Sequence, residues 1–355
     1  AGIVLSASHN PAQDNGIKIF DSKGLKLSEK DEKNIEQIYS SNTYSKNTNG
    51  IGKATRIDDA RGRYIEFVKA SISNESLEGL FIVVDCANGA AYSMAENIFS
   101  ELGAKVICVN NKPNGLNINL DCGAMHPQTI MRLVKKSGAD AGIAFDGDAD
   151  RVVFCDENGQ LVHGDQAIGL FALELKKSGS LKNNSIVATH LSNKGLTEFL
   201  KTQNINVITC EVGDKNVVEA MKKNNISFGA EQSGHIVFSN TSTTGDGLIA
   251  ALQLLKILKS STKKLSELKK SVKLYPQEQE SIKVKEKKPF ESIKSVQQEI
   301  LKAQNLLAGT GRVLVRYSGT EKKARVMIEA QSKKMAKDLT RKIALAIKKE
   351  IGEKA

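Results

Sequence analysis

Short apolar runs rich in β-branched residues recur along the chain and alternate with stretches of helical periodicity. A short apolar run bounded by polar residues favours a buried strand, whereas apolar residues spaced three and four apart favour a helix. Strands that alternate with helices predict βαβ units with mixed or parallel sheets. The predicted strands are residues 3–5, 81–84, 106–109, 142–145, 152–155, 186–188 and 207–209, and the predicted helices are residues 129–136, 166–176 and 216–223.

The pattern changes after a lysine-rich segment, residues 263–273, which Pro276 follows closely. A helix is predicted over residues 291–304, strands over 313–317 and 325–329, and a long basic helix over 333–349. This order predicts a separate α+β domain at the C-terminal end. The predicted domain boundaries are 1–75, 76–160, 161–274 and 275–355.

Composition narrows the function classes. The 355 residues are 40% hydrophobic, which is too much for one core and favours several domains. The formal net charge of +11 is explained mainly by solvated helix faces, with steering of an anionic substrate as the alternative. Scarce aromatic residues argue against base stacking on nucleic acid. Five cysteines without a CxxC pair predict a reducing cytoplasm, and no apolar run approaches the ~20 residues of a membrane span.

The first segment with potential chemistry combines a serine, a histidine and a lysine. Ser8 and His9 precede Asn10 and Pro11, and Lys18 follows. A hydroxyl beside a histidine and near a lysine suits an activated nucleophile or a phosphoryl carrier. Proline disfavours helical backbone at the preceding residue, so an ordinary surface turn explains the same pattern. The segment alone leaves both interpretations open.

Three aspartates stand at alternate positions directly after a predicted strand. Asp146, Asp148 and Asp150 precede Arg151, and alternate side chains of an extended backbone lie on one side. Carboxylate oxygens at a strand end suit Mg²⁺. An EF-hand also uses alternating aspartates, but it needs glycine where Arg151 stands. A phosphatase with Asp146 as nucleophile would leave the serine segment without a role. A purely structural turn is disfavoured because packed carboxylates repel one another without a cation.

Two later segments carry weaker signals. Glu231, Ser233 and His235 offer donors and acceptors for sugar hydroxyls, and His235 suits an acid or base; a hydrogen-bonded structural histidine is the alternative. The other segment follows a predicted strand, where an anion cradle and an ordinary turn both fit. It consists of Arg316, Ser318, Gly319, Thr320 and Arg325.

Taken together and in this order, the four segments resemble the α-D-phosphohexomutase superfamily, which has a serine loop, a metal loop, a sugar loop and a phosphate loop, one per domain. The resemblance covers essentially the whole chain. Residues 2–20, the segment 117–119 and Gln232 resemble the branch that isomerises glucosamine phosphates. The resemblance implies an α/β fold with three βαβ-type mixed-sheet domains, the first incomplete, and a C-terminal α+β domain.

The same resemblance implies a mechanism. Glucosamine 6-phosphate and glucosamine 1-phosphate would interconvert through a phosphoserine and a bisphosphate, with one Mg²⁺ per site, as a step towards UDP-N-acetylglucosamine and the cell wall. A phosphoglucomutase or phosphomannomutase is the alternative. The implied catalytic residues are Ser8, His9, Asn10, Lys18, Arg151 and His235. The implied substrate-binding residues are Gly213, Asp214, Glu231, Ser233, Arg316, Ser318, Gly319, Thr320 and Arg325. The implied metal ligands are Ser8, Asp146, Asp148 and Asp150.

Further expectations follow from the resemblance. In the superfamily the serine loop lies well inside the first domain, so we expect part of that domain to be missing and residues 1–355 alone to be inactive and prone to aggregate. A non-catalytic phosphosugar-binding relative is the alternative from another class, and Ser8, Lys18 and the three aspartates speak against it. We expect a hexosamine phosphate substrate, a cytoplasmic location, and no nucleic-acid or membrane partner. The resemblance allows a homodimer.

Overall fold

A computed structural model describes residues 1–42, 50, 52–318 and 321–353. The chain forms two compact units. The larger comprises Ala1–Leu191 and Gln203–Ser271, and the smaller comprises Ser192–Thr202 and Val272–Ala355. Within the described ranges, no helix combines the length and the apolar character that a bilayer crossing requires.

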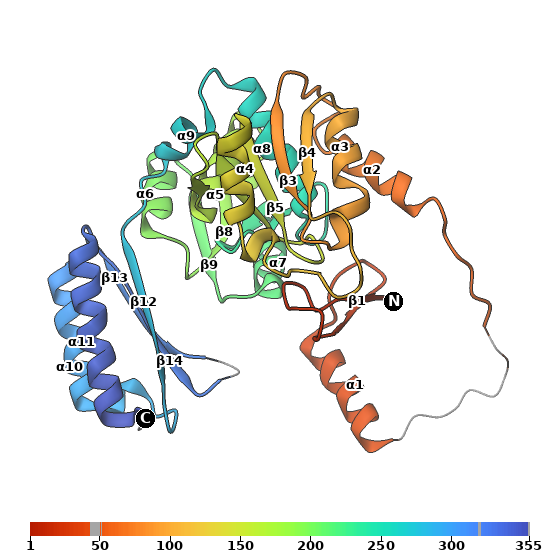
Figure 1. The fold of residues 1–355 in the computed structure, drawn as a ribbon. Coiled ribbons are helices and arrows are strands. Elements are labelled where there is room, and N and C mark those ends of the chain that lie inside the picture. Colours follow the sequence, from red (N-terminus) through yellow and green to blue (C-terminus); the bar gives the residue numbers. More distant parts are fainter. Residues whose placement is uncertain (43–49, 51, 319–320, 354–355) are drawn as a thin grey trace. The chain divides into compact units, whose positions relative to one another are not determined.

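The first large sheet confirms four of the predicted strands (Figure 1). Strand β3 pairs in parallel with β4 and β5, and β5, β6 and β7 follow in antiparallel order. Every residue of β5 is buried, as expected for a strand covered on both faces. In spatial order the strands are β4 (Lys105–Val109), β3 (Phe81–Asp85), β5 (Ala141–Phe145), β6 (Val152–Asp156) and β7 (Leu161–Val162).

Helices α3 (Ala95–Glu101) and α4 (Gln128–Ser137) accompany this sheet. Ile130 and Val134 of α4 pack with Val83 and Ala144 of the sheet. This packing fixes the carboxyl end of β5, from which the metal loop described below begins.

The second sheet of the larger unit confirms the strands predicted over residues 186–188 and 207–209 and adds two short strands. Strand β8 pairs in parallel with β9 and β10, and β10 pairs antiparallel with β11. In spatial order the strands are β11 (Ile236–Phe238), β10 (Phe228–Ala230), β8 (Ser185–Thr189) and β9 (Asn206–Cys210). Helices α5 (Gly164–Lys177), α7 (Asp214–Lys223) and α8 (Gly247–Ser260) belong with this sheet, and α9 (Leu265–Leu268) follows.

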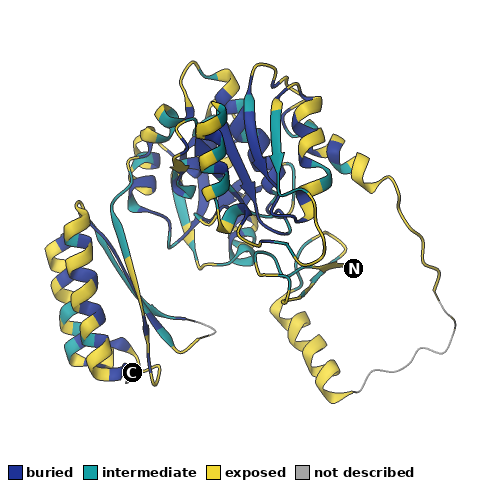
Figure 2. Ribbon diagram, in the orientation of Figure 1, coloured by how far each residue is buried: buried dark blue, intermediate teal, exposed yellow. Residues whose placement is uncertain are grey.

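The N-terminal part of the larger unit is more exposed. Strands β1 (Gly2–Leu5) and β2 (Ile17–Phe20) form an antiparallel hairpin, and helix α1 (Glu29–Ser41) contains no buried residue. Figure 2 shows this contrast with the dark blue interior of the two large sheets. Helix α2 (Ala60–Ala70) buries Ile65 and Val68.

The smaller unit is the α+β arrangement that the sequence predicts. Its antiparallel sheet has the order β12 (Gln277–Lys283), β14 (Lys323–Glu329) and β13 (Arg312–Tyr317). Helices α10 (Lys294–Leu307) and α11 (Lys333–Ile351) share a core with it, and α6 (Lys194–Thr202) also belongs to this unit. The predicted helix 291–304 begins later, at Lys294, because the three residues after Pro289 form a 3₁₀ turn.

Candidate active site

The serine loop connects β1 to β2 and lies against the metal loop that follows β5. The Ser8 hydroxyl donates to Asp146 Oδ2 at 3.1 Å, and the Ser6 hydroxyl donates to Asp148 Oδ2 at 2.8 Å. Ser6 Oγ also accepts the Ser8 backbone N–H at 2.9 Å. The structure therefore brings together two loops that lie far apart in the sequence.

The backbone of the serine loop is unusual at Ser8, whose φ of 54° lies in the left-handed region. Residues other than Gly, Asn and Asp rarely adopt this left-handed conformation, and those that do are often found at functional sites. His9 Nδ1 lies 3.4 Å from the Ser8 hydroxyl. The Asn10 side chain donates to Asp14 at 3.0 Å, so Asn10 shapes the loop itself.

The three aspartates converge, but on a turn and not on the extended backbone that the prediction assumed: Ala149 N–H donates to Asp146 O at 3.0 Å, and the φ of Ala149 is 60°. Ligand oxygens of Asp146, Asp148 and Asp150 all lie within 4.8 Å of one another. Asp148 Oδ1 and Asp150 Oδ1 are buried and have no hydrogen-bond partner in the described part of the chain. Unpartnered buried carboxylate oxygens are costly unless a cation compensates them, so the cluster fits a hard divalent ion such as Mg²⁺.

Lys18 supplies positive charge at the same place. Its Nζ lies 2.5 Å from Asp148 Oδ2 and 3.4 Å from Asp150 Oδ2. Burial opposes the charged ammonium, but the hydrogen bond to Asp148 and the two carboxylate charges outweigh it and raise the pKa of Lys18. Burial likewise opposes ionisation of Asp148, and Lys18 outweighs it and lowers the pKa of that carboxyl.

Asp146 is in a different environment from its neighbours. It is fully buried, and its Oδ1 accepts the Arg151 backbone N–H at 3.1 Å. Burial, followed by the charges of Asp150 and Asp148, raises the pKa of Asp146 to about 7. A proton and a metal ion therefore compete for this carboxylate near neutral pH.

The sugar loop joins β10 to β11 and lies beside the metal loop, because Val152 N–H donates to Gly234 O at 3.1 Å. Glu231 Oε1 accepts the Gly213 N–H at 2.8 Å, and the Ser233 hydroxyl lies 3.4 Å from Glu231 Oε2. The sequence-predicted residues Gly213, Glu231 and Ser233 are therefore neighbours.

His235 occupies the centre of this region. It is 2% exposed, and neither ring nitrogen has a hydrogen-bond partner among the described residues. Burial lowers the pKa of His235, so its imidazole is neutral at neutral pH. Glycine at position 245 permits close packing, since a Cβ there would lie 2.4 Å from His235 Nε2.

Asp150, Asp214 and His235 form a second group whose ligand atoms lie within 4.8 Å of one another. Cations already surround it: Lys26 Nζ pairs with Asp214 Oδ2, Lys18 pairs with Asp150, and Arg151 Nε lies 3.9 Å from Asp150 Oδ1. Because these three cations already offset the carboxylate charges, the group favours an anionic or hydroxyl-bearing ligand over a second metal ion.

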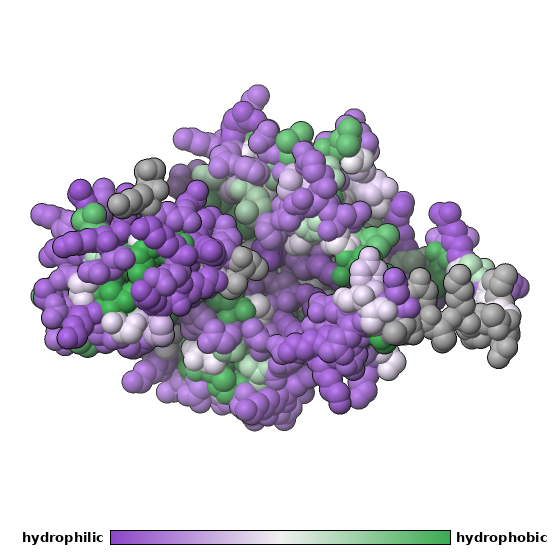
Figure 3. Space-filling view, turned by 90° about the horizontal axis from the view of Figure 1, so that it is seen from below, coloured by the Kyte–Doolittle hydropathy of each residue, from purple (hydrophilic) through white to green (hydrophobic). Residues whose placement is uncertain are grey.

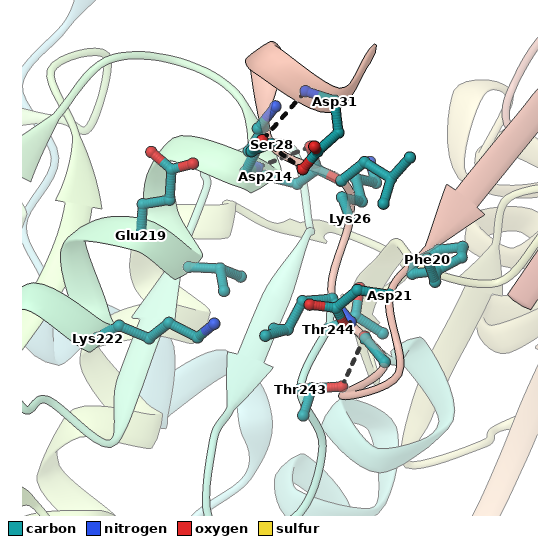
Figure 4. A pocket seen from close by; sticks show the side chains of 15 residues that line it. Phe20, Asp21, Lys26, Ser28, Asp31, Asp214, Glu219, Lys222, Thr243 and Thr244 are labelled. Carbon is teal, nitrogen blue, oxygen red and sulfur yellow. Dashed lines mark hydrogen bonds and ion pairs between the residues drawn. The ribbon is translucent and has the colours of Figure 1, made fainter. Parts of the chain in front are cut away.

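A cavity of about 220 Å³ opens next to Asp214, between the segment that links β2 to α1 and helix α7 (Figure 4). Lys26, Lys215 and Lys222 line it together with Asp214 and Glu219. It adjoins the site but includes neither Ser8 nor the three metal-loop aspartates.

The fourth predicted loop lies in the smaller unit. Arg316 and Arg325 stand directly opposite one another on β13 and β14. Two facing guanidinium groups suit the recognition of a phosphate, and Arg325 Nη2 also lies 3.7 Å from Glu321 Oε2. Ser318 is buried, its hydroxyl oxygen accepts the Glu321 N–H at 3.4 Å, and its carbonyl accepts from Lys287 Nζ at 2.6 Å. Gly319 and Thr320 lie outside the described residues.

Sequence reasoning gave no role to three residues that the structure places at the site. Ser6 bonds Asp148, Lys26 pairs with Asp214, and Asn119 donates to the backbone of the serine loop. Ser6 stands in the serine segment itself, so its hydroxyl was a usable signal. The contacts of Lys26 and Asn119 span 188 and 111 positions along the sequence, so no local sequence pattern predicts them.

Family models for phosphoglucomutase/phosphomannomutase match the chain four times: domain I over residues 1–46, domain II over 62–159, domain III over 163–275 and the C-terminal domain over 281–346. Two curated relatives named phosphoglucosamine mutase cover 99% of this chain. The protein from Protochlamydia amoebophila is 47% identical and is covered over 78% of its length. The protein from Aliarcobacter butzleri is 48% identical and is covered over 80%.

Solved structures show the same fold. A phosphoglucomutase/phosphomannomutase family protein from Burkholderia thailandensis superposes with a TM-score of 0.80 at 20% identity, covering 99% of this chain and 78% of that one. An Aspergillus fumigatus N-acetylphosphoglucosamine mutase in complex with GlcNAc-6P and magnesium superposes with a TM-score of 0.76 at 21% identity, covering 98% and 88%.

Proposed function

The chain belongs to the phosphoglucomutase/phosphomannomutase family and matches phosphoglucosamine mutases over almost its whole length, and from this premise we propose that it interconverts glucosamine 6-phosphate and glucosamine 1-phosphate. The observation that carries the proposal is the meeting of Ser8 with Asp146, Asp148 and Lys18. These are a phosphoryl carrier, metal ligands and a fixed cation in one place.

Ser8 Oγ carries the phosphoryl group in this proposal. A sugar hydroxyl attacks the phosphorus, so a new oxygen–phosphorus bond forms as the bond from phosphorus to Ser8 Oγ breaks. The sugar then holds two phosphates. After the bisphosphate turns around, Ser8 Oγ attacks the other phosphate and regains a phosphoryl group, and the isomerised monophosphate is released.

The roles in proton transfer are assigned from the lowered pKa of His235 and the raised pKa of Lys18. Burial keeps the His235 imidazole neutral, so it can accept the proton of the attacking sugar hydroxyl and return it in the second half of the reaction. Lys18 stays protonated because Asp148 and Asp150 hold it, so it stabilises negative charge instead. Arg151 supplies a second cation beside Asp150.

Asp146, Asp148, Asp150 and the phosphate of Ser8 would hold one Mg²⁺. When bound, the ion offsets negative charge on the transferring phosphoryl group. The unpartnered oxygens Asp148 Oδ1 and Asp150 Oδ1 support this assignment.

Substrate contacts are assigned to two groups of residues. Glu231, Ser233, Gly213 and Asp214 would hold sugar hydroxyls near His235. Arg316, Ser318, Gly319, Thr320 and Arg325 would hold the phosphate that is not reacting, and the facing arginines of β13 and β14 support this role.

The five free cysteines support a reducing, cytoplasmic location.

A coupled assay of the full chain with glucosamine, glucose and mannose 1-phosphates tests the proposal. We expect kcat/KM to be highest for glucosamine 1-phosphate. Equal values for glucose 1-phosphate would favour a phosphoglucomutase. Because residues 1–355 alone are expected to be inactive, the assay uses the full-length protein, and no turnover of any sugar phosphate by that protein would reject a mutase.

A further inference from the structure

Asn119 lies between β4 and α4 and reaches the serine loop. Its side chain is buried, with 7% exposed. Its backbone φ is 57°, a left-handed conformation that asparagine tolerates better than most residues. A buried amide at such a position needs partners for its polar atoms.

Both N–H groups of the Asn119 amide have partners in the serine loop. Nδ2 donates to the carbonyl oxygen of Ser8 and to that of Asn10, each at 2.9 Å. An amide nitrogen carries two hydrogens, so donors and acceptors match in number. Carbonyl oxygens only accept, and the amide oxygen therefore cannot take the place of the nitrogen here.

The surrounding backbone is shaped around this contact. Asn119 N–H donates to Ala87 O at 2.9 Å, and Ala90 N–H donates to Gly147 O at 2.8 Å. A Cβ on Gly147 would lie 2.5 Å from Ser8 O and 2.7 Å from Asn119 Nδ2. The serine loop, the metal loop and Asn119 thus meet at Gly147, where only glycine leaves room.

The neighbouring Asn117 provides a contrast. Its Oδ1 accepts the Asn114 N–H at 2.9 Å, and its Nδ2 donates to Lys112 O at 3.0 Å. These bonds shape the loop of Asn117 itself and do not reach Ser8. These four hydrogen bonds of the two side-chain amides all join backbone atoms, so the resemblance of segment 117–119 to the glucosamine branch reflects loop architecture.

We propose that Asn119 is a positioning residue, which fixes the phosphoryl-carrying Ser8 against the metal loop and does not select the sugar. The two hydrogen bonds hold the Ser8 and Asn10 carbonyls, on either side of His9, and so fix the left-handed backbone of Ser8, which directs Ser8 Oγ towards Asp146. This inference rests on the proposed function, because it assigns Asn119 to the phosphoryl transfer step.

Asn119→Asp tests the inference in the full chain. Aspartate has the same shape and tolerates the same backbone, but it presents an oxygen to the two carbonyls. We expect kcat to fall about 100-fold, the cost of ~1 Å misplacement, while KM for glucosamine 6-phosphate changes less than about threefold. Asn119→Gly, which still allows the left-handed backbone at this position, should likewise lower kcat while KM changes little. Asn117→Asp is the matched control and should keep kcat within about threefold.

A second readout does not depend on turnover. Hydrogen exchange of a peptide covering residues 6–10 should accelerate at least tenfold in both Asn119 variants and stay unchanged in Asn117→Asp. Wild-type kcat or wild-type exchange in the Asn119 variants, or a raised KM at constant kcat, would overturn the inference. If the wild-type full-length protein turned over no glucosamine phosphate, the proposed function would fail, while the exchange result would still decide whether Asn119 holds the loop.

Discussion

At the scale of single residues, the site depends on carboxylates that are held close together in a buried place. Asp146, Asp148 and Asp150 repel one another, and Lys18 offsets this repulsion only in part because its Nζ contacts two of them. The alternate spacing of the aspartates predicts their convergence. The distant side-chain partners of these carboxylates come from the serine loop and β2, 130 or more positions away, and the spacing of the aspartates contains no information about them.

Asp148→Asn should weaken Mg²⁺ binding and turnover together. The substitution removes one charge from the metal site and the partner of Lys18. Since even residues behind the ligands cost 10- to 100-fold in metal affinity when changed, we expect at least that loss. Titration of activity with Mg²⁺ measures it, and Asp121→Asn, at an exposed turn, is the control. Unchanged activity at limiting Mg²⁺ would place the metal elsewhere.

Asp146 should make the effect of Mg²⁺ on stability depend on pH. Burial raises its pKa to about 7, against about 4 in the unfolded chain. Between these values the metal-free folded state holds a proton that the unfolded state has released, so its stability falls as the pH rises from about 4 to about 7. Mg²⁺ needs the ionised carboxylate, so the rise in Tm caused by Mg²⁺ should be larger at pH 7.5 than at pH 5.5. Equal rises in Tm at both values would contradict the assignment.

At the scale of elements, the apolar pattern predicts strands well where a strand is buried on both faces. All five residues of β5 and of β8 are buried, and both strands were predicted within one residue at either end. The pattern does not reveal which elements share a compact unit. Helix α6 follows β8 directly in sequence, yet it belongs to the smaller unit, where Lys194 N–H donates to Glu329 of β14. Long-range contacts of this kind are set by tertiary packing.

Helix α8 offers an element-scale test through its N-cap, Asp246. The carboxylate accepts N–H bonds from Leu248 and Ile249 and also the hydroxyl of Tyr64 at 2.7 Å. Asp246→Ala removes the cap, worth about 1 kcal/mol, and leaves the hydroxyl of the half-buried Tyr64 unpaired, which costs about 1–3 kcal/mol more. We expect the free energy of unfolding to fall by about 2–4 kcal/mol in urea titrations.

Ser332→Ala provides the matched control for that experiment. Ser332 caps α11 by accepting the Met335 N–H, and it is exposed, so its removal should cost only about 1 kcal/mol. Tyr64→Phe combined with Asp246→Ala should recover part of the loss, since no unpaired hydroxyl remains. Equal costs for the two caps would show that the bond to Tyr64 contributes nothing.

At the scale of the whole molecule, the charge is unevenly divided. The smaller unit contains 22 Lys and Arg residues against 11 Asp and Glu residues, whereas the larger unit contains 29 of each, so the entire net charge of +11 belongs to the smaller unit. Hydrophilic side chains cover most of the face in Figure 3. Solvated helix faces were expected to explain most of the +11 charge. The concentration of that charge in the unit with Arg316 and Arg325 instead supports the alternative, the steering of an anionic substrate.

Steering predicts that salt lowers kcat/KM while kcat changes little, because screening acts on the encounter. Replacing Lys334, Lys337, Lys342 and Lys348 of α11 by Gln should lower kcat/KM and flatten its salt dependence. These lysines are exposed, so stability should hardly change. Replacing the exposed Lys135, Lys136, Lys177 and Lys182 of the larger unit is the control. An equal salt dependence of kcat/KM in the wild type and both variants would show that the charge serves solubility and not the encounter with substrate.

The central claim, that Ser8 carries the transferred phosphoryl group, is tested most directly by locating the phosphate. The full-length protein is incubated with a hexose 1,6-bisphosphate and Mg²⁺, digested, and mapped by mass spectrometry. The account predicts one phosphate on Ser8, and it predicts that Ser8→Ala carries none, keeps its fold and has no mutase turnover. A phosphate on Ser6 or Asp146, or turnover in Ser8→Ala, would contradict it.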